Sequence, residues 1–214
     1  MADWIPDVLG DEFEQLTLDL GEDDEGAVVA TLVRALPPAQ GWWERLRGRR
    51  RPLDGVDVLY VHGWSDYFFQ KRLARFWTAR GARFFALDLR KYGRSLRDGQ
   101  TPGYVVDLAT YDEDIAAALE EMGHGGERVP GQRRLVLFGH STGGLTLSLW
   151  TSRHPDVADA VILNSPWLEF QVAAARPAIA PVVELQARWW PRDVAPQVDL
   201  GFYRLIVFES VDTV

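Results

Sequence analysis

Cysteine, long apolar runs and early positive charge are absent from this sequence of 214 residues. Without cysteine, a disulfide scaffold, a cysteine nucleophile and thiolate metal ligands are excluded. No stretch approaches the roughly 20 apolar residues that span a bilayer. No lysine or arginine precedes Arg34, and Asp3 and Asp7 stand where a signal peptide has a basic start and an apolar run. We therefore expect a cytoplasmic protein with no integral membrane segment.

The overall charge limits the partners of the protein. The net charge is −8, so a nucleic-acid-binding surface is not expected. A hydrophobic content of 47% is typical of a globular protein, and the length predicts one domain over residues 1–214.

Aromatic residues are plentiful, since the chain has nine tryptophans. Some of them could line an apolar substrate site, and the alternative is ordinary packing in the core and at the surface. The tryptophans considered for such a site are Trp42, Trp43, Trp64, Trp167, Trp189 and Trp190.

The beginning of the chain has the pattern of paired strands. Leu16, Leu18 and Leu20 alternate with polar residues, which predicts a half-buried strand. Residues 27–33 form a second apolar run, and residues 21–26 between them predict an antiparallel hairpin with a longer loop.

From residue 56 onward, short apolar runs alternate with helical patterns. Strands are predicted at 58–61, 84–87, 135–138 and 161–163, and helices at 69–80, 111–122 and 145–153. This alternation predicts an α/β fold with a mostly parallel, doubly wound sheet, to which the hairpin adds antiparallel strands. In such a sheet, ligands bind at the carboxyl ends of the strands.

The most informative stretch runs from Gly139 to Gly144, with Ser141 at its centre. An apolar strand leads into it and an amphipathic helix leads out, as in the nucleophile elbow of a serine hydrolase. Gly139 and Gly143 would let neighbouring backbone approach closely, and the helix start would direct free N–H groups at developing negative charge. The alternative is a tight turn with an ordinary serine.

Two other predicted strands end in polar loops. His62, Gly63 and Trp64 follow the strand at 58–61, and residues 88–95 follow the next strand. In a parallel sheet, both loops open on the same rim as the elbow.

These motifs resemble the α/β-hydrolase superfamily, and most closely its serine aminopeptidase, lysophospholipase and monoacylglycerol lipase-like branch. The resemblance covers Val56 to Trp167. It implies Ser141 as the nucleophile, with an oxyanion hole made by the backbone N–H groups of Trp64 and Thr142. It also implies that His62 shapes a loop and is not the catalytic base.

The loop after the second parallel strand also resembles the family motif D-x-R-G-x-G-x-S. Asp88, Arg90, Gly93 and Ser95 match the motif, while Lys91 stands where the family usually has glycine. This departure concerns the conformation of the turn. We expect Asp88 and Arg90 to tie loops together.

A catalytic histidine is missing from the expected place. In this fold the order along the chain is serine, acid, histidine, and the only histidine after Ser141 is His154. Twelve helical residues at about 1.5 Å rise place it roughly 18 Å from the serine, beyond hydrogen-bond reach. Asp212 is a candidate for the acid. We expect a truncated or frame-shifted end, a sheet without its C-terminal strands, and an exposed edge at 161–163.

Residues 167–196 are rich in alanine, valine and aromatic side chains and contain several prolines. The resemblance implies a helical cap over the active site here, and an ordinary crossover helix is the alternative.

The sequence thus supports a serine hydrolase that cleaves carboxylic esters, with lipid or lysophospholipid esters as candidate substrates. An aminopeptidase-type amide hydrolase is a close relative, and a catalytically inactive fragment that lacks the triad acid and histidine is the rival. The resemblance implies no metal and no organic cofactor. A small-molecule ester is the expected partner, and the oligomeric state stays open.

Overall fold

The computed structural model describes residues 3–38 and 50–168, together with the isolated positions 181, 185, 188, 189 and 192. The chain divides into two compact units, residues 1–170 and 171–214. The fold described below belongs to the first unit, and the expectation of a single domain stays a prediction. None of the helices in the described part of the chain is both long and apolar enough to cross a membrane.

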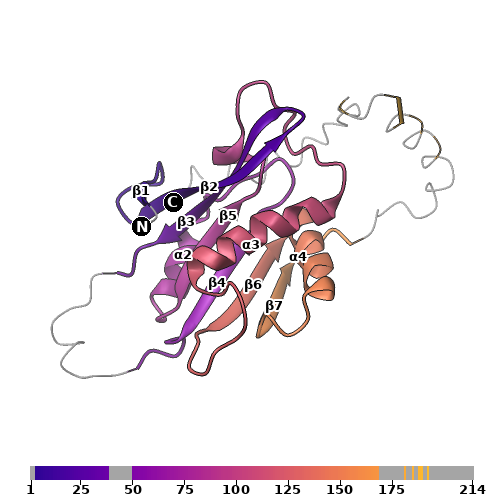
Figure 1. The fold of residues 1–214 in the computed structure, drawn as a ribbon. Helices are drawn as coiled ribbons and strands as arrows, with labels where there is room; N and C mark the ends of the chain where they lie inside the picture. The colour runs from indigo at the N-terminus through magenta and orange to yellow at the C-terminus, as the bar shows by residue number, and fades with distance from the viewer. Residues whose placement is uncertain are drawn as a thin grey trace. The chain divides into compact units, whose positions relative to one another are not determined.

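A seven-stranded mixed sheet forms the centre of the first unit (Figure 1), with strand order β1-β2-β3-β5-β4-β6-β7. The strands are β1 (Ile5–Pro6), β2 (Phe13–Asp23), β3 (Gly26–Ala35), β4 (Val56–Val61), β5 (Arg83–Asp88), β6 (Arg134–His140) and β7 (Ala160–Asn164). Strands β5, β4, β6 and β7 are parallel, and the first three strands join them antiparallel. This is the predicted α/β-hydrolase architecture.

The amino-terminal hairpin is tighter than the sequence indicated. Strand β2 continues to Asp23, which pairs with Gly26, so that Asp24 and Glu25 alone form the turn. The prediction of a longer loop was wrong, because the two strands pair again after a register shift between Asp19 and Glu22, so that β2 continues beyond Gly21.

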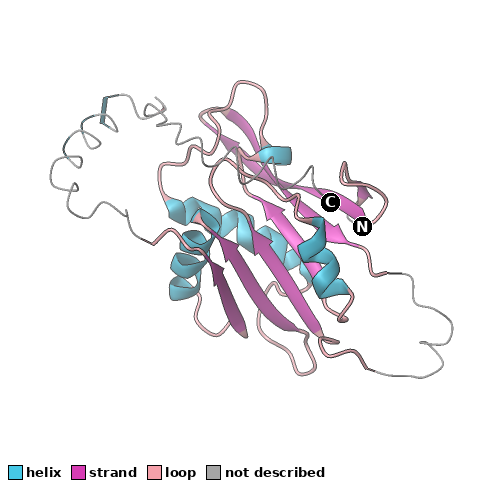
Figure 2. Cartoon of the chain, turned by 180° about the vertical axis from the view of Figure 1, so that it is seen from behind, coloured by secondary structure: helices cyan, strands magenta, loops and turns pink. Residues whose placement is uncertain are grey.

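Helices cover both faces of the sheet (Figure 2). They are α2 (Lys71–Thr78), α3 (Tyr111–Met122) and α4 (Thr142–Arg153). Helices α3 and α4 pack on one face with Leu59 and Leu137, and α2 packs on the other with Val58 and Tyr60. Because alternate residues of β4 enter two different cores, the strand is buried along its whole length.

The helix ends follow local chemistry. Helix α3 ends where predicted, since Gly123 adopts the left-handed conformation that terminates it. Helix α2 is shorter than the predicted 69–80, because Gln70 has non-helical dihedral angles and the helix begins only at Lys71.

Strand β7 lies at the edge of the described sheet and pairs with β6. All five of its residues are exposed, and Val161, Ile162 and Leu163 each retain at least 37% exposure. Within the described residues, the expectation of an exposed edge at 161–163 is confirmed.

Candidate active site

Ser141 lies at a sharp bend between β6 and α4. Its dihedral angles are φ 53° and ψ −117°, and Thr142 directly begins the helix. A positive φ is strained for a residue with a side chain, and such strain persists only where the surroundings impose it. The bend leaves Ser141 partly exposed at the carboxyl edge of the sheet.

Three glycines make this bend possible. A Cβ atom on Gly143 would lie 2.3 Å from the carbonyl oxygen of His62, and one on Gly139 would lie 2.6 Å from that of Gly143. A Cβ atom on Gly63 would lie 3.1 Å from the Cβ atom of Ser141. At Gly139 and Gly143 the neighbouring backbone therefore lies closer than a residue with a Cβ atom permits, and at Gly63 the approach is tight.

Backbone hydrogen bonds hold the elbow in place. The Ser141 N–H donates to the carbonyl of Asn164 at 3.1 Å, which ties the bend to the end of β7. The Ser141 carbonyl accepts from the N–H groups of Gly144 at 3.0 Å, Leu145 at 3.3 Å and Trp167 at 2.9 Å. The serine backbone is thus fixed from both the helix and the loop that follows β7.

Two backbone N–H groups beside the elbow have no acceptor in the described part of the chain. Neither the N–H of Trp64 nor that of Thr142 donates to any residue within 3–38 or 50–168. Thr142 occupies the first position of α4, where an N–H has no partner within its own helix. Both residues line one cavity of about 210 Å³.

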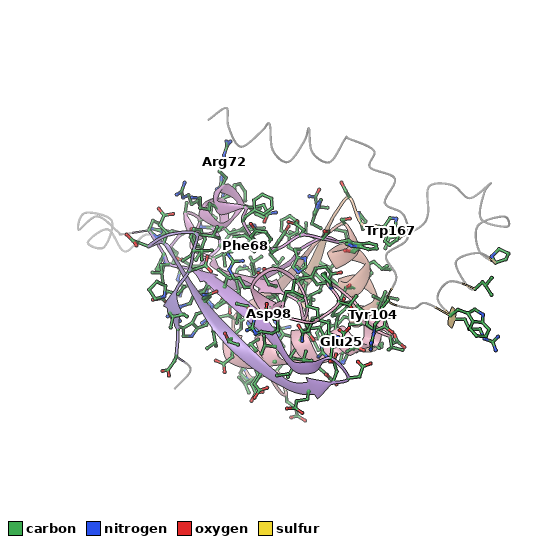
Figure 3. The ribbon with its side chains drawn as sticks, turned by 90° about the horizontal axis from the view of Figure 1, so that it is seen from above. Glu25, Phe68, Arg72, Asp98, Tyr104 and Trp167 are labelled. Atoms are coloured by element: carbon green, nitrogen blue, oxygen red, sulfur yellow. The ribbon has the colours of Figure 1, made fainter. Side chains whose placement is uncertain are left out.

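The walls of this cavity come from the loops after β4, β5 and β7, from the start of α3 and from the first turn of α4. Apolar side chains such as Leu89, Leu108 and Leu145 form much of it. Trp167 also lines it (Figure 3), so that two of the candidate tryptophans, Trp64 and Trp167, reach the site. Trp42, Trp43 and Trp190 lie outside the described residues.

His62 is buried, and both of its ring nitrogens are engaged. Nε2 accepts the N–H of Leu89 at 3.1 Å, and Nδ1 lies 2.7 Å from the carbonyl oxygen of Gly63, to which it donates. These bonds join the loop after β4 to the loop after β5. A ring with both nitrogens occupied is not free to act as a base.

Asp88 ties the neighbouring loops together. Its carboxylate accepts the Phe68 N–H at 2.8 Å and is bound by the Arg94 Nη1 at 2.7 Å. Arg90 makes a similar tie to α3, since its Nε donates to Asp114 at 2.6 Å. Burial raises the pKa of Asp114 to about 6, while the guanidinium of Arg90 acts in the opposite direction.

Lys91 adopts the left-handed conformation, with φ 61°, where the family motif has glycine. Its buried Nζ lies 2.6 Å from carboxylate oxygens of Asp23, at the end of β2, and of Glu25, in the turn of the hairpin. Glu25 and Tyr104, which lies near the same ammonium group, appear side by side in Figure 3. Lys91 thus adopts the left-handed backbone conformation that glycine favours, and its side chain adds ion pairs to the hairpin.

None of the four histidines is placed as a base for Ser141. His124 lies at the opposite edge of the sheet, 2.9 Å from Asp57, and His154 caps the far end of α4 against Trp150. His140 directly precedes the serine, and its Nδ1 lies 3.1 Å from the side-chain amide of Asn164. Asp212 and most of the predicted cap at 167–196 lie outside the described residues.

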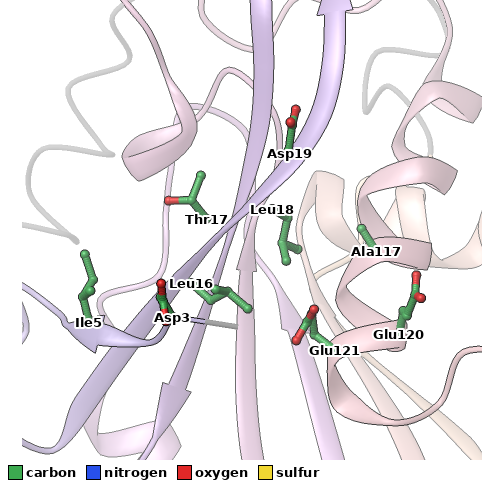
Figure 4. Close-up of a pocket in the computed structure, with 9 residues that line it drawn as sticks. All are labelled: Asp3, Ile5, Leu16, Thr17, Leu18, Asp19, Ala117, Glu120 and Glu121. Atoms are coloured by element: carbon green, nitrogen blue, oxygen red, sulfur yellow. The ribbon is translucent and has the colours of Figure 1, made fainter. Parts of the chain in front are cut away.

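A larger cavity of about 520 Å³ lies away from this site, between β2 and α3 (Figure 4). Its walls include Asp19, Glu120 and Glu121 around Leu16 and Leu18, and none of them belongs to a strand-end loop. No cluster of three or more His, Asp or Glu side chains in the described part of the chain is arranged to hold a metal ion.

Some residues of the site were not predicted from the sequence. Tyr92 and Tyr111 both line the cavity beside Thr142. Tyr92 lies in the loop that matches the family motif, and its proximity to a strand end was the available signal. Tyr111 begins α3, and only the fold brings it to the cavity.

The sequence is similar to those of known hydrolases. The chain is 33% identical over 121 residues to the bifunctional esterase/perhydrolase DCH of Acinetobacter calcoaceticus, covering 53% of this chain and 38% of that protein. It is 32% identical over 124 residues to lysophospholipase L2 of Escherichia coli K12, covering 56% of this chain and 35% of that one. The chain therefore spans little more than a third of either relative.

The fold is also similar to that of a probable hydrolytic enzyme from Pseudomonas aeruginosa PAO1, with a TM-score of 0.51 and 15% identity over 91% of this chain and 58% of that one. The family model described as serine aminopeptidase, S33, matches residues 56–206, which include all four parallel strands and the elbow. The chain thus belongs to the serine aminopeptidase family of the α/β-hydrolase superfamily.

Proposed function

We propose that the protein is a serine hydrolase that cleaves carboxylic esters through an acyl-enzyme on Ser141. The Oγ atom attacks the carbonyl carbon and transfers its proton to a base, and the oxyanion receives hydrogen bonds from the N–H groups of Trp64 and Thr142. Collapse of the tetrahedral intermediate expels the alcohol, and water then hydrolyses the acyl-enzyme. The described residues offer no base, and Asp212 stays a candidate for its acid partner.

One observation carries this proposal: a serine in a strained conformation directly precedes Thr142, which lines a cavity together with Trp64, and the N–H groups of these two residues have no acceptor among the described residues. A structural turn gains nothing from such strain, whereas a nucleophile gains exposure and nearby donors. Gly63, Gly139 and Gly143 support the arrangement by permitting the close approach of the backbone, and His62 supports it by fixing the loop that carries Trp64.

Ester substrates are supported by the names of the relatives, which include an esterase and a lysophospholipase. Amide cleavage is the close alternative, because the family is described as one of serine aminopeptidases and the same chemistry opens both bonds. Hydrolysis of p-nitrophenyl acetate against that of an amino-acid p-nitroanilide separates the two.

A fluorophosphonate probe tests the nucleophile directly. We expect covalent labelling of the wild-type chain, located at Ser141 by mass spectrometry and lost in Ser141→Ala. Ser152→Ala is the matched control, because Ser152 is an exposed serine of the same helix and should leave labelling unchanged.

The rival proposal is a catalytically inactive hydrolase-fold protein. It is favoured by the positions of the four histidines, none of which serves Ser141. Absence of labelling at high probe concentration, in a sample that unfolds cooperatively, would support this rival and refute the hydrolase.

A further inference from the structure

Charge is unevenly distributed along this chain. Ten of its 23 lysine and arginine residues lie within residues 45–83, whereas only three of its 31 aspartate and glutamate residues do. No acidic residue occurs between Tyr67 and Arg83. A chain with a net charge of −8 thus contains one strongly basic segment, to which helix α2 belongs.

Helix α2 exposes its cations on one side. Residues four apart share a helix face, and exposed side chains recur at this spacing from the start of α2 to just beyond its end. On the opposite side, Leu73, Ala74 and Trp77 pack on the core. Arg72 projects outward from the fold (Figure 3). We call the exposed side the basic face, and it consists of Lys71, Arg72, Arg75, Phe76 and Arg80.

The first turn of α2 carries charges that oppose its own stability. Lys71 and Arg72 are its first two residues, and cations are unfavourable there because the N-terminal end of the helix dipole is positive. Helix α3 follows the usual rule, with Asp112, Glu113 and Asp114 in its first turn. Neither Lys71 nor Arg72 forms an ion pair with a carboxylate of the described residues. Neither helix stability nor an ion pair in this part of the chain therefore accounts for the two cations.

The basic face also exposes an aromatic ring. Phe76 is 49% exposed, and the Arg80 guanidinium carbon lies 3.6 Å from the centre of its ring. Exposed aromatic rings among basic residues are typical of surfaces that lie on anionic lipid, where the cations meet the headgroups and the ring enters the boundary with the acyl chains. A soluble polyanion would use the cations alone, whereas a lipid surface uses both the cations and the ring.

Two neighbouring side chains border the basic face. Arg51 ends a run of five arginines between residues 45 and 51, and its Nη1 donates to the Thr78 carbonyl at 3.3 Å, which extends the positive charge at the end of α2. On another side, a carboxylate oxygen of Glu12 lies 2.8 Å from the Nε of Arg75. Both partners of this ion pair are more than half exposed, so the pair is weak and leaves Arg75 available to a stronger anion.

We propose that the basic face docks the protein on the surface of an anionic phospholipid bilayer. Its ammonium and guanidinium groups bind the lipid phosphates, and Phe76 inserts between the headgroups. This docking is independent of the reaction at Ser141, and it brings the loop that carries Trp64 and leads into α2 towards the lipid.

Sedimentation of the full chain with lipid vesicles at low ionic strength tests this proposal. We expect the wild type to bind vesicles of phosphatidylcholine with phosphatidylglycerol at least about tenfold more tightly than vesicles of phosphatidylcholine alone. One basic residue near an anionic membrane contributes about fivefold in affinity, so Lys71→Gln/Arg72→Gln should weaken binding to the anionic vesicles by roughly 25-fold. Glutamine has nearly the helix propensity of lysine and arginine, and the helix should therefore be retained.

The matched control is Arg128→Gln/Arg153→Gln, which removes the same charge from outside the basic face. Both arginines are exposed, and their ion pairs with Asp159 and Asp112 lie at the surface. This variant should change vesicle binding by less than about twofold. Phe76→Gln keeps every cation and should weaken binding to the anionic vesicles by about fivefold, because an exposed ring no longer leaves water.

Equal binding of the wild type to the two kinds of vesicle, or no binding to either, would overturn the proposal without reference to any variant. A loss in the control as large as that in Lys71→Gln/Arg72→Gln would do the same. Anionic binding that Phe76→Gln leaves unchanged would assign the face to soluble polyanions and reject the lipid. Sedimentation velocity without vesicles covers the last alternative: self-association lost in Lys71→Gln/Arg72→Gln, with no vesicle binding, would assign the face to a second copy of the chain.

Discussion

The two ends of strand β4 differ in how completely their polar groups are satisfied. At the amino end, the fully buried carboxylate of Asp57 is bound by Arg83 Nε at 2.7 Å, Arg133 Nε at 2.5 Å and His124 Nε2 at 2.9 Å. Arg83 also donates to the Met122 carbonyl at the end of α3. Asp57 thus joins the starts of three neighbouring strands to a helix end.

At the carboxyl end, Trp64 lies seven residues after Asp57. Its N–H has no acceptor among the described residues. The neighbouring strand β6 ends at His140 and is followed directly by Ser141, whose backbone is strained. The amino edge of the sheet thus contributes to the stability of the fold. Under the proposed function, the carboxyl edge holds N–H donors and a strained serine that a ligand would use.

Removal of the Asp57 carboxylate should produce the largest effect. Asp57→Ala should lower the free energy of unfolding by about 3 kcal/mol, because a fully buried acceptor of several charged donors is lost while the half-exposed arginines can rehydrate. Urea denaturation measures this loss. Glu12→Ala is the control, since its ion pair with Arg75 is exposed and should change stability by less than about 1 kcal/mol. Equal effects of the two substitutions would remove the basis of the comparison.

The same carboxylate should govern the response to acid. Burial opposes ionisation of Asp57, but hydrogen bonds from Arg83, His124 and Arg133 hold its pKa well below the ordinary value in the folded protein. Its stabilisation is therefore present above about pH 4, the unfolded pKa of an aspartate, and is lost as the pH falls further. In urea titrations from pH 7 to pH 3, Asp57→Asn should lose less stability than the wild type. A parallel decline of the two proteins would contradict this assignment.

At the carboxyl edge, Gly143→Ala should lower the free energy of unfolding by about 2 kcal/mol, because its Cβ atom would collide with the carbonyls of Val61 and His62. Helix propensity alone predicts the opposite sign, since Gly143 lies in the first turn of α4 and alanine favours helices by up to about 1 kcal/mol. Thermal unfolding therefore distinguishes close packing from propensity by the direction of the change.

The smallest effect should be a gain. Ser141→Gly should raise the free energy of unfolding by about 1 kcal/mol, because glycine adopts a positive φ without strain. Ser141→Ala should leave stability nearly unchanged, since alanine is as strained as serine there. Chemical denaturation of the two variants measures the strain, and a glycine variant less stable than the alanine variant would show that the bend stores none.

Local patterns predicted most of the fold because they report short-range chemistry. The apolar run before Ser141 indicates a strand, and the glycine after Met122 indicates the end of a helix. The hairpin loop was predicted too long, because the register shift between Asp19 and Glu22 depends on pairing with β3. Lys91 was seen as a departure from the family motif, but its ion pairs with the hairpin could not be predicted.

The sequence by itself determined the strand and helix pattern, the bend at Ser141 and the glycines that permit it, because each depends on the conformational preferences of neighbouring residues. Tertiary structure alone decided that Asp57 meets His124 and Arg133, and that Lys91 meets Glu25 of the hairpin. These partners lie far apart along the chain, and no spacing rule relates them. Only the packing of the sheet and its helices brings them within hydrogen-bond distance.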